Sequence, residues 1–208
     1  MMKRVLVIAF AMFMSLTLFA QKKGDRFVGV GISASAGKIY VESDYDEIIS
    51  QPLNSSFYLG GELGFFPKDN LKLALALGMG YSTTPIGEVD GEWIKLRGIG
   101  LNVNPNISYY VELVKNRFYY APELGFSIEA GTLKERTFID EPHIDGYFAW
   151  QCYLSFIGFE FRATRDFAMG ISVGSLNYTS LKELQCDITT SQFTFKLNQA
   201  ALYAKFYF

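Results

Sequence analysis

Charged residues recur inside segments that are otherwise apolar or built from small residues, and they are the groups best placed for ion-pair chemistry. They are Glu62, Lys72, Glu123, Glu160 and Arg162. A charge that leaves water is costly unless an opposite charge and hydrogen bonds compensate it. We therefore expect these five side chains to face one shared interior and to form a charge network there.

His143 is the single histidine of the chain and the side chain best suited to proton transfer near neutral pH. It stands beside Asp140, Glu141 and Asp145, which also offer oxygen ligands for a metal ion. No serine nucleophile is tied to it by spacing, and a solvated polar loop explains the same residues. We therefore predict a protein without catalytic residues, metal site or cofactor.

Two other motifs have an ordinary structural explanation. The stretch from Gly29 to Ala34 matches a loose dinucleotide fingerprint, but that fingerprint opens a helix after a strand, whereas this stretch alternates as a strand. Two polar stretches are rich in carboxylates that suit Ca²⁺: Glu42, Asp44, Asp46 and Glu47, then Glu88, Asp90 and Glu92. They lack the glycine of an EF-hand loop, so we interpret them as solvated loops.

Cys152 and Cys186 are the only cysteines. An exported protein meets an oxidising compartment, where a disulfide between them can form and persist. Sequence alone does not give the Cα separation that a disulfide requires, so the bridged and the free states both stay open.

The elements that carry these side chains have an apolar period of two, which predicts β-strands. We expect eight strands, at 28–35, 57–66, 71–80, 99–109, 118–128, 153–162, 167–174 and 192–208. Short turns at 67–70, 113–117 and 164–166 alternate with long polar loops at 37–55, 82–93, 131–146 and 178–191. An even number of strands joined this way predicts an all-β fold, an eight-stranded antiparallel barrel of the outer-membrane type.

The first 20 residues have the pattern of an export signal. Lys3 and Arg4 precede an apolar run that ends at Phe19 and Ala20, as in a cleaved secretory signal peptide. We predict a leader at 1–20 and one barrel domain at 21–208. Without the two basic residues of the leader, the 19 basic and 21 acidic residues leave 17 − 21, a net charge of −4. This balance argues against a nucleic-acid partner.

The two faces of the predicted strands differ in a way that bears on the solvent. One face is apolar, and the other is rich in Gly, Ala and Ser with few charges, which suits a lipid-facing wall and a filled lumen. A soluble lipocalin-like barrel is the alternative, with the apolar face inside. Pro105 and Pro122 predict bulges, and the alternation slips at 98–100, at Phe156 and at 198–200.

The chain resembles the small outer-membrane β-barrel proteins, and within them the PorT-like outer-membrane β-barrel domain. The resemblance rests on the leader ending at Gln21, on the segments 101–110 and 121–126, and on the last strand ending at Phe206 and Phe208. It implies that these terminal aromatic residues are read by the barrel assembly machinery. It also implies residence among outer-membrane lipids of a bacterial cell envelope.

The resemblance indicates the architecture far more than the function, because the fold hosts many unrelated activities. The function that we expect is non-enzymatic. We expect a structural role, or an interaction with an unidentified external ligand or protein through the loops. A porin-like narrow channel for ions or small solutes is one alternative. A lipid-modifying enzyme with a lateral opening at the two in-strand prolines is another.

Overall fold

The computed structural model describes residues 22–37, 40–42, 48–50, 54–89, 92–136, 144–184 and 189–208. Nearly all of them lie in strands: β1 (Arg26–Gly37), β2 (Tyr40–Glu42), β3 (Ile48–Ser50), β4 (Asn54–Lys68), β5 (Leu71–Val89), β6 (Glu92–Tyr109), β7 (Val111–Val114), β8 (Phe118–Tyr120), β9 (Glu123–Arg136), β10 (Ile144–Arg162), β11 (Phe167–Glu183) and β12 (Thr189–Tyr207). Within these residues, no helix is long and apolar enough to cross a membrane.

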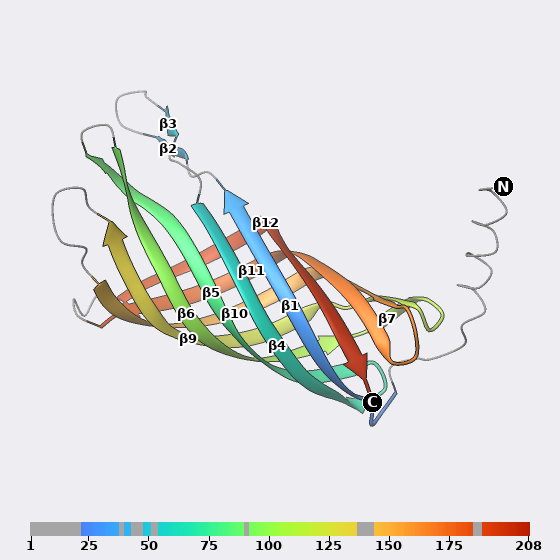
Figure 1. Cartoon of the computed structure of the whole chain (residues 1–208). Coiled ribbons are helices and arrows are strands. Elements are labelled where there is room, and N and C mark those ends of the chain that lie inside the picture. Colours follow the sequence, from blue (N-terminus) through green and yellow to red (C-terminus); the bar gives the residue numbers. More distant parts are fainter. Residues whose placement is uncertain are drawn as a thin grey trace, which may run out of the picture.

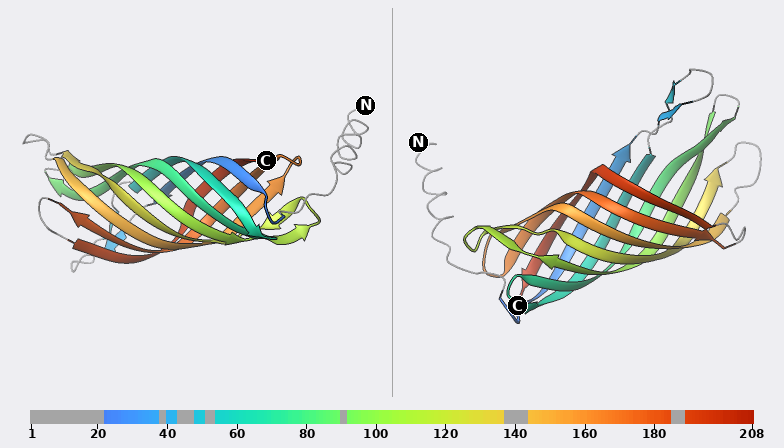
Figure 2. Two further views of the ribbon diagram at one scale, coloured as in Figure 1. Left: turned by 90° about the horizontal axis from the view of Figure 1, so that it is seen from below. Right: turned by 180° about the vertical axis from the view of Figure 1, so that it is seen from behind.

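Eight of these strands close into an antiparallel ring, which confirms the predicted fold class. The order is β12, β1, β4, β5, β6, β9, β10 and β11, and β11 pairs again with β12. The wall and its tilted strands are visible from several sides in Figures 1 and 2. β7 and β8 continue β6 and β9 as a short hairpin at the turn end, where β8 pairs with β10. β2 and β3 pair separately.

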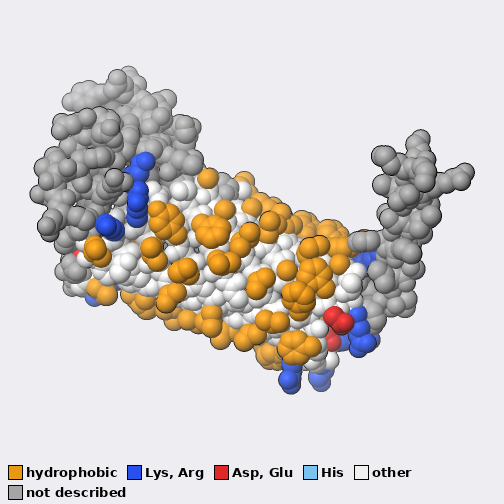
Figure 3. All heavy atoms as spheres, viewed as in Figure 1, with side chains coloured by type: hydrophobic (Ala, Val, Ile, Leu, Met, Phe, Trp, Pro, Cys, Tyr) orange, Lys and Arg blue, Asp and Glu red, His pale blue; other side chains and the backbone are white. Residues whose placement is uncertain are grey.

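The outer surface of the barrel is apolar and its interior is polar. Leu101, Leu63 and Val30 expose 67%, 61% and 58% of their surface, while their strand neighbours face inward. Figure 3 shows hydrophobic side chains along the visible wall, with charged side chains near its two ends. An apolar belt of this extent belongs in lipid, where a closed sheet also satisfies every backbone group. The soluble alternative, with its apolar face inside, is therefore wrong.

The connections differ between the two ends of the barrel. At the turn end, Asn70 and Asn116 adopt positive φ angles of 64° and 59°, which asparagine tolerates in tight turns. At the opposite end, the loops predicted at 82–93, 131–146 and 178–191 are longer than the loops in the structure, because the strands continue into these ranges. β5 and β6 run to residues 89 and 92, and the pairs β9–β10 and β11–β12 also extend well into these stretches. Hairpin pairing can continue beyond the lipid because it needs only one neighbouring strand.

The two in-strand prolines behave differently. At Pro122 the register against β10 changes between the pair Tyr120 and Phe159 and the pair Glu123 and Ser155, so the predicted irregularity is present. At Pro105 the predicted bulge is wrong, because the register against β9 is the same on both sides of 104–105. Asn104 and Pro105 have no paired residue on β9, and a missing proline N–H is tolerated at such a position. The slip predicted at 98–100 is also wrong, since Gly98 and Gly100 both face inward.

The inward-facing positions switch parity together on three neighbouring strands. On β10 they are odd-numbered up to Ser155 and even-numbered from Gly158. β11 switches at Gly174, which has a φ of +76°, and β12 bulges at 197–199. Phe156 stacks on Phe195 at a centroid distance of 5.6 Å, and a Cβ atom at Gly174 would lie 2.9 Å from the Phe156 ring. Glycine at this position therefore leaves room for the stack, and the slips predicted at Phe156 and 198–200 are confirmed.

Candidate functional site

The turn end of the lumen is closed by packed aromatic side chains. Phe27, Phe66, Tyr110, Tyr119 and Tyr207 are all buried and form one cluster, which we call the aromatic plug. Their ring centroids lie 5.4 Å apart for Phe66 and Tyr110, 5.9 Å for Tyr110 and Tyr119, and 5.7 Å for Phe27 and Tyr207. These separations are those of favourable aromatic contacts. The plug leaves this end of the barrel filled by side chains.

A buried ion pair stands against the plug. The Lys205 ammonium donates to Glu160 Oε2 at 2.9 Å and to the Tyr110 hydroxyl at 2.8 Å. The Tyr110 hydroxyl donates to Glu160 Oε2 at 2.9 Å, and the Tyr207 hydroxyl donates to Glu160 Oε1 at 2.7 Å. Both carboxylate oxygens of Glu160 are therefore hydrogen-bonded, as a fully buried charge requires.

A second ion cluster lies further along the lumen. The Lys72 ammonium bridges two carboxylates, at 2.9 Å from Glu62 Oε1 and 2.6 Å from Glu123 Oε2. The Tyr153 hydroxyl donates to Glu123 Oε1 at 2.8 Å. Glu62 Oε2 lies 3.9 Å from the Lys205 ammonium, which links this cluster to the ion pair at the plug. The lumen charges thus form one chain across β4, β5, β9, β10 and β12.

Arg162 lies against the Tyr207 ring of the plug. Its guanidinium lies 4.2 Å from the centre of the Tyr207 ring and donates to the Arg165 carbonyl at 2.8 Å. Asp25 Oδ2 lies 3.8 Å from the Arg162 guanidinium. Arg162 therefore caps the plug at the turn end of the barrel.

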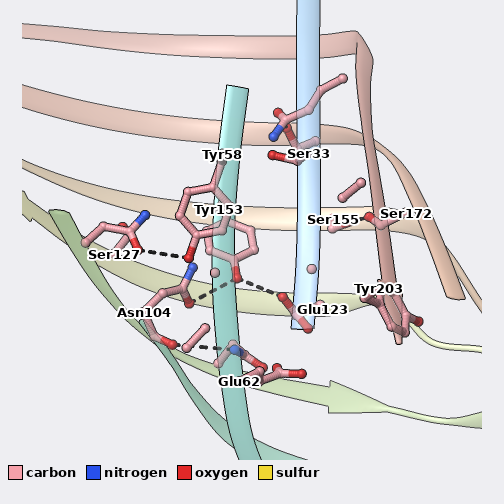
Figure 4. Close-up of a pocket in the computed structure, with 18 of the residues that line it drawn as sticks. Ser33, Tyr58, Glu62, Asn104, Glu123, Ser127, Tyr153, Ser155, Ser172 and Tyr203 are labelled. Carbon is pink, nitrogen blue, oxygen red and sulfur yellow. Dashed lines mark hydrogen bonds between the residues drawn. The ribbon is translucent and has the colours of Figure 1, made fainter. Parts of the chain in front are cut away.

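The lumen beside the plug holds a cavity of about 390 Å³, and Glu62, Lys72 and Glu123 of the second ion cluster are among its lining residues. Figure 4 shows Tyr58 and Tyr153 among the side chains that line it, with Glu123 and Asn104 in hydrogen-bonding reach of Tyr153. Further polar lining comes from Asn102, Ser127, Gln151, Asn177 and Gln199. Amides and hydroxyls are groups that hydrogen-bond water and neutral polar solutes. The lining of the cavity can therefore hydrogen-bond water, and the plug closes the cavity at one end.

Glycines give the cavity its width. A Cβ atom at Gly78 would collide with the Tyr58 ring, and one at Gly125 would collide with the Tyr153 ring. Each tyrosine therefore lies flat against a glycine of a neighbouring strand instead of filling the centre. This is the physical use of the inward Gly residues that alternate with apolar ones in the sequence.

The structure places the predicted charged residues in two groups. Glu62, Lys72 and Glu123 come together, Glu160 pairs with Lys205, and Arg162 stands apart. Sequence reasoning missed Lys205. The available signal was its position between the outward-facing Ala204 and Phe206 in the last strand, which makes it an inward residue.

Other predicted residues fall on the periphery. Phe206 and Phe208 point outward at the turn end, and their role in assembly stays a prediction. Cys152 is on the outward face of β10, while Cys186 lies outside the described residues, so their disulfide stays a prediction. His143 and most of the carboxylates of the two acidic loops also lie outside the described residues. Among those described, no group of acidic, histidine and cysteine side chains suits a metal ion.

No family model and no curated protein matches this sequence. Among solved structures, the chain is similar to the attachment invasion locus protein Ail of Yersinia pestis, with 12% identity, coverage of 89% of this chain and 99% of that one, and a TM-score of 0.42. It is also similar to OprG from Pseudomonas aeruginosa (13%, 91% and 98%, 0.42) and to Neisserial surface protein A (12%, 89% and 98%, 0.39).

OprG is an outer-membrane protein, and at these identities and TM-scores the similarity says nothing about the function of the present chain. The architecture of the present chain rests on its own strand pairing. Its resemblance to the PorT-like family stays a prediction, because no family model matches.

Proposed function

We propose that this protein is an outer-membrane β-barrel with a lumen closed to through-flow, and that it serves the cell envelope as a structural element or through its external loops. The observation that carries the proposal is the aromatic plug with its adjoining buried ion pair. Ions crossing the barrel would have to displace five buried rings and separate Glu160 from Lys205. The apolar belt and the export leader support the location in an outer membrane.

Planar-bilayer conductance of the refolded protein tests this proposal. The wild-type barrel is expected to give no steady current steps, with heat-modifiable gel mobility showing that it is folded. The double substitution Phe66→Ala and Tyr119→Ala removes two rings of the plug and is expected to produce steps. Phe65→Ala, on the outward face beside Phe66, is the matched control and is expected to stay silent.

Steady steps from the folded wild-type protein would contradict the closed lumen and favour the narrow channel. Silence from the folded double variant would show that the plug is not what blocks the barrel.

A lipid-modifying activity has less support. It needs a lateral opening, and the interruption at 104–105 between β6 and β9 is bounded by paired residues in a single register. The Ser108 hydroxyl also donates to the Pro122 carbonyl at 2.7 Å, which ties β6 to the segment between β8 and β9.

A further inference from the structure

The outward face of β6 and β9 carries basic residues directly opposite one another. Arg97 pairs in register with Lys134, and Lys95 pairs with Arg136. Positions two apart on a strand share a face, so Lys95 and Arg97 are neighbours on the same side of β6. The side chains of Lys95, Arg97 and Lys134 are exposed, and we call these three the basic cluster.

The in-register neighbours of the basic cluster on the flanking strands carry no charge. On the flanking strands, Arg97 faces Thr83 of β5 and Lys134 faces Ile144 of β10, which are both uncharged. Among the residues whose side chains the structure describes, no carboxylate forms an ion pair with Lys95, Arg97 or Lys134. Like charges directly opposite one another destabilise a sheet, so the arrangement calls for an anion from outside the chain.

The cluster stands where the apolar belt ends. The next outward-facing residues along β6 are Ile99 and Leu101, which are 53% and 67% exposed, and Thr132 is the next along β9. Figure 3 shows Lys and Arg side chains bordering the belt at the end where the β5–β6 hairpin projects in Figure 1. In a bilayer this level is that of the headgroups, and basic side chains there attract anionic lipids.

We propose that the basic cluster binds the phosphate group of an anionic lipid in the leaflet on the long-loop side. The acyl chains of the lipid would lie on Ile99 and Leu101, and the guanidinium of Arg97 would hold the phosphate by paired hydrogen bonds. Lys134 and Lys95 would supply the remaining positive charge. This inference rests on the proposed membrane location and names a lipid class that the protein would select.

Quenching of the tryptophan fluorescence by brominated lipids measures this selection. The protein is folded into phosphatidylcholine vesicles, and brominated phosphatidylglycerol is compared with brominated phosphatidylcholine. At about 1 kcal/mol for each basic residue near an anionic surface, each lost charge weakens binding about fivefold, so the substitution pair Arg97→Gln and Lys134→Gln should lower the preference for phosphatidylglycerol about 30-fold. The control pair Lys68→Gln and Lys115→Gln removes the same charge from the exposed turn end and should keep the preference.

A second measurement, the stability of the same variant in urea, should change in the opposite direction to its lipid preference. In a zwitterionic detergent without anionic lipid, the Arg97→Gln and Lys134→Gln variant should unfold at a higher urea concentration than the wild type, because the like-charge pair is gone. An equal loss of lipid preference in both variant pairs would overturn the inference in favour of general charge attraction. If inorganic phosphate stabilised the wild-type barrel in detergent as much as phosphatidylglycerol does, the lipid assignment would be overturned in favour of a soluble anion.

Failure of the proposed function looks different in the same experiment. A wild-type protein that stays protease-sensitive and without heat-modifiable mobility in phosphatidylcholine vesicles would contradict the membrane barrel, and the lipid site with it. A protein that inserts normally but shows no preference for phosphatidylglycerol would contradict the lipid site alone.

Discussion

Replacing Lys205 by methionine should destabilise the barrel more than any surface substitution. The Lys205 side chain is 3% exposed and the Glu160 side chain is fully buried, with 2.9 Å between the ammonium and Glu160 Oε2. Methionine has a similar length but no charge, so Lys205→Met leaves the Glu160 carboxylate with the Tyr110 and Tyr207 hydroxyls as its hydrogen-bond donors. The ion pair is removed while the packing volume is largely kept.

The magnitude follows from the burial of the pair. Removing one partner of a buried ion pair costs about 3–5 kcal/mol, because the remaining charge is uncompensated. The two tyrosine hydroxyls still donate to Glu160, so we expect the lower end, about 3 kcal/mol of unfolding free energy. The double substitution Lys205→Met and Glu160→Gln removes both charges and should recover about 2 kcal/mol of that loss.

Urea unfolding in lipid vesicles, followed by heat-modifiable gel mobility, measures these differences. Arg165→Gln is the matched control, because the Arg165–Asp166 pair is 72% and 75% exposed with 4.0 Å between its charges. It should cost less than about 1 kcal/mol. The reasoning is refuted if Lys205→Met costs no more than this control, or if the double substitution is as unstable as the single one.

Two further substitutions test the glycines of the wall. Gly174→Ala should cost about 2 kcal/mol, because alanine is strained at a φ of +76° and its Cβ atom would push the Phe156 ring away from Phe195; Gly61→Ala, where only a carbonyl lies within 4 Å, should be nearly neutral. Gly78→Val should displace the Tyr58 ring into the cavity. The absorbance of the tyrosines, or the loss of a solute bound in the cavity, would reveal this displacement. An unshifted Tyr58 signal would contradict the prediction.

The strand count and the two faces of each strand could be predicted from sequence because both follow from a period of two. Val28, Val30 and Ile32 alternate with small residues whatever the strand pairs with, and the structure keeps that alternation. Local chemistry also located Pro122 as an irregularity and Asn70 within a tight turn. These features depend on neighbours within a few residues.

The partners inside the lumen could not be predicted in the same way. Lys72 and Glu123 are 51 residues apart, and Lys205 and Glu160 are 45 apart. Which inward charge meets which depends on the stagger of all the strands around the ring. That stagger is altered by register shifts after Phe65, after Pro85 and after Val173. Only the last of these coincides with a slip predicted from the sequence, the one at 198–200.

The hairpins that continue at the long-loop end were also beyond sequence reasoning. The residues of 82–89 and 92–96 are more polar than those below them, and polarity alone does not distinguish a solvated strand from a loop. Whether such residues form a strand or a loop depends on their pairing with the neighbouring strand, as it does for β5 and β6.

The seam between β1 and β12 sets an order of events during biogenesis. Its strands lie far apart in the sequence, so Phe27 cannot meet Tyr207 until β12 has been synthesised. The same last strand carries Lys205, so Glu160 has no ammonium partner until β12 arrives. Closing the wall and neutralising the lumen are therefore one event, and an intermediate that lacks β12 keeps both an open edge and an uncompensated carboxylate.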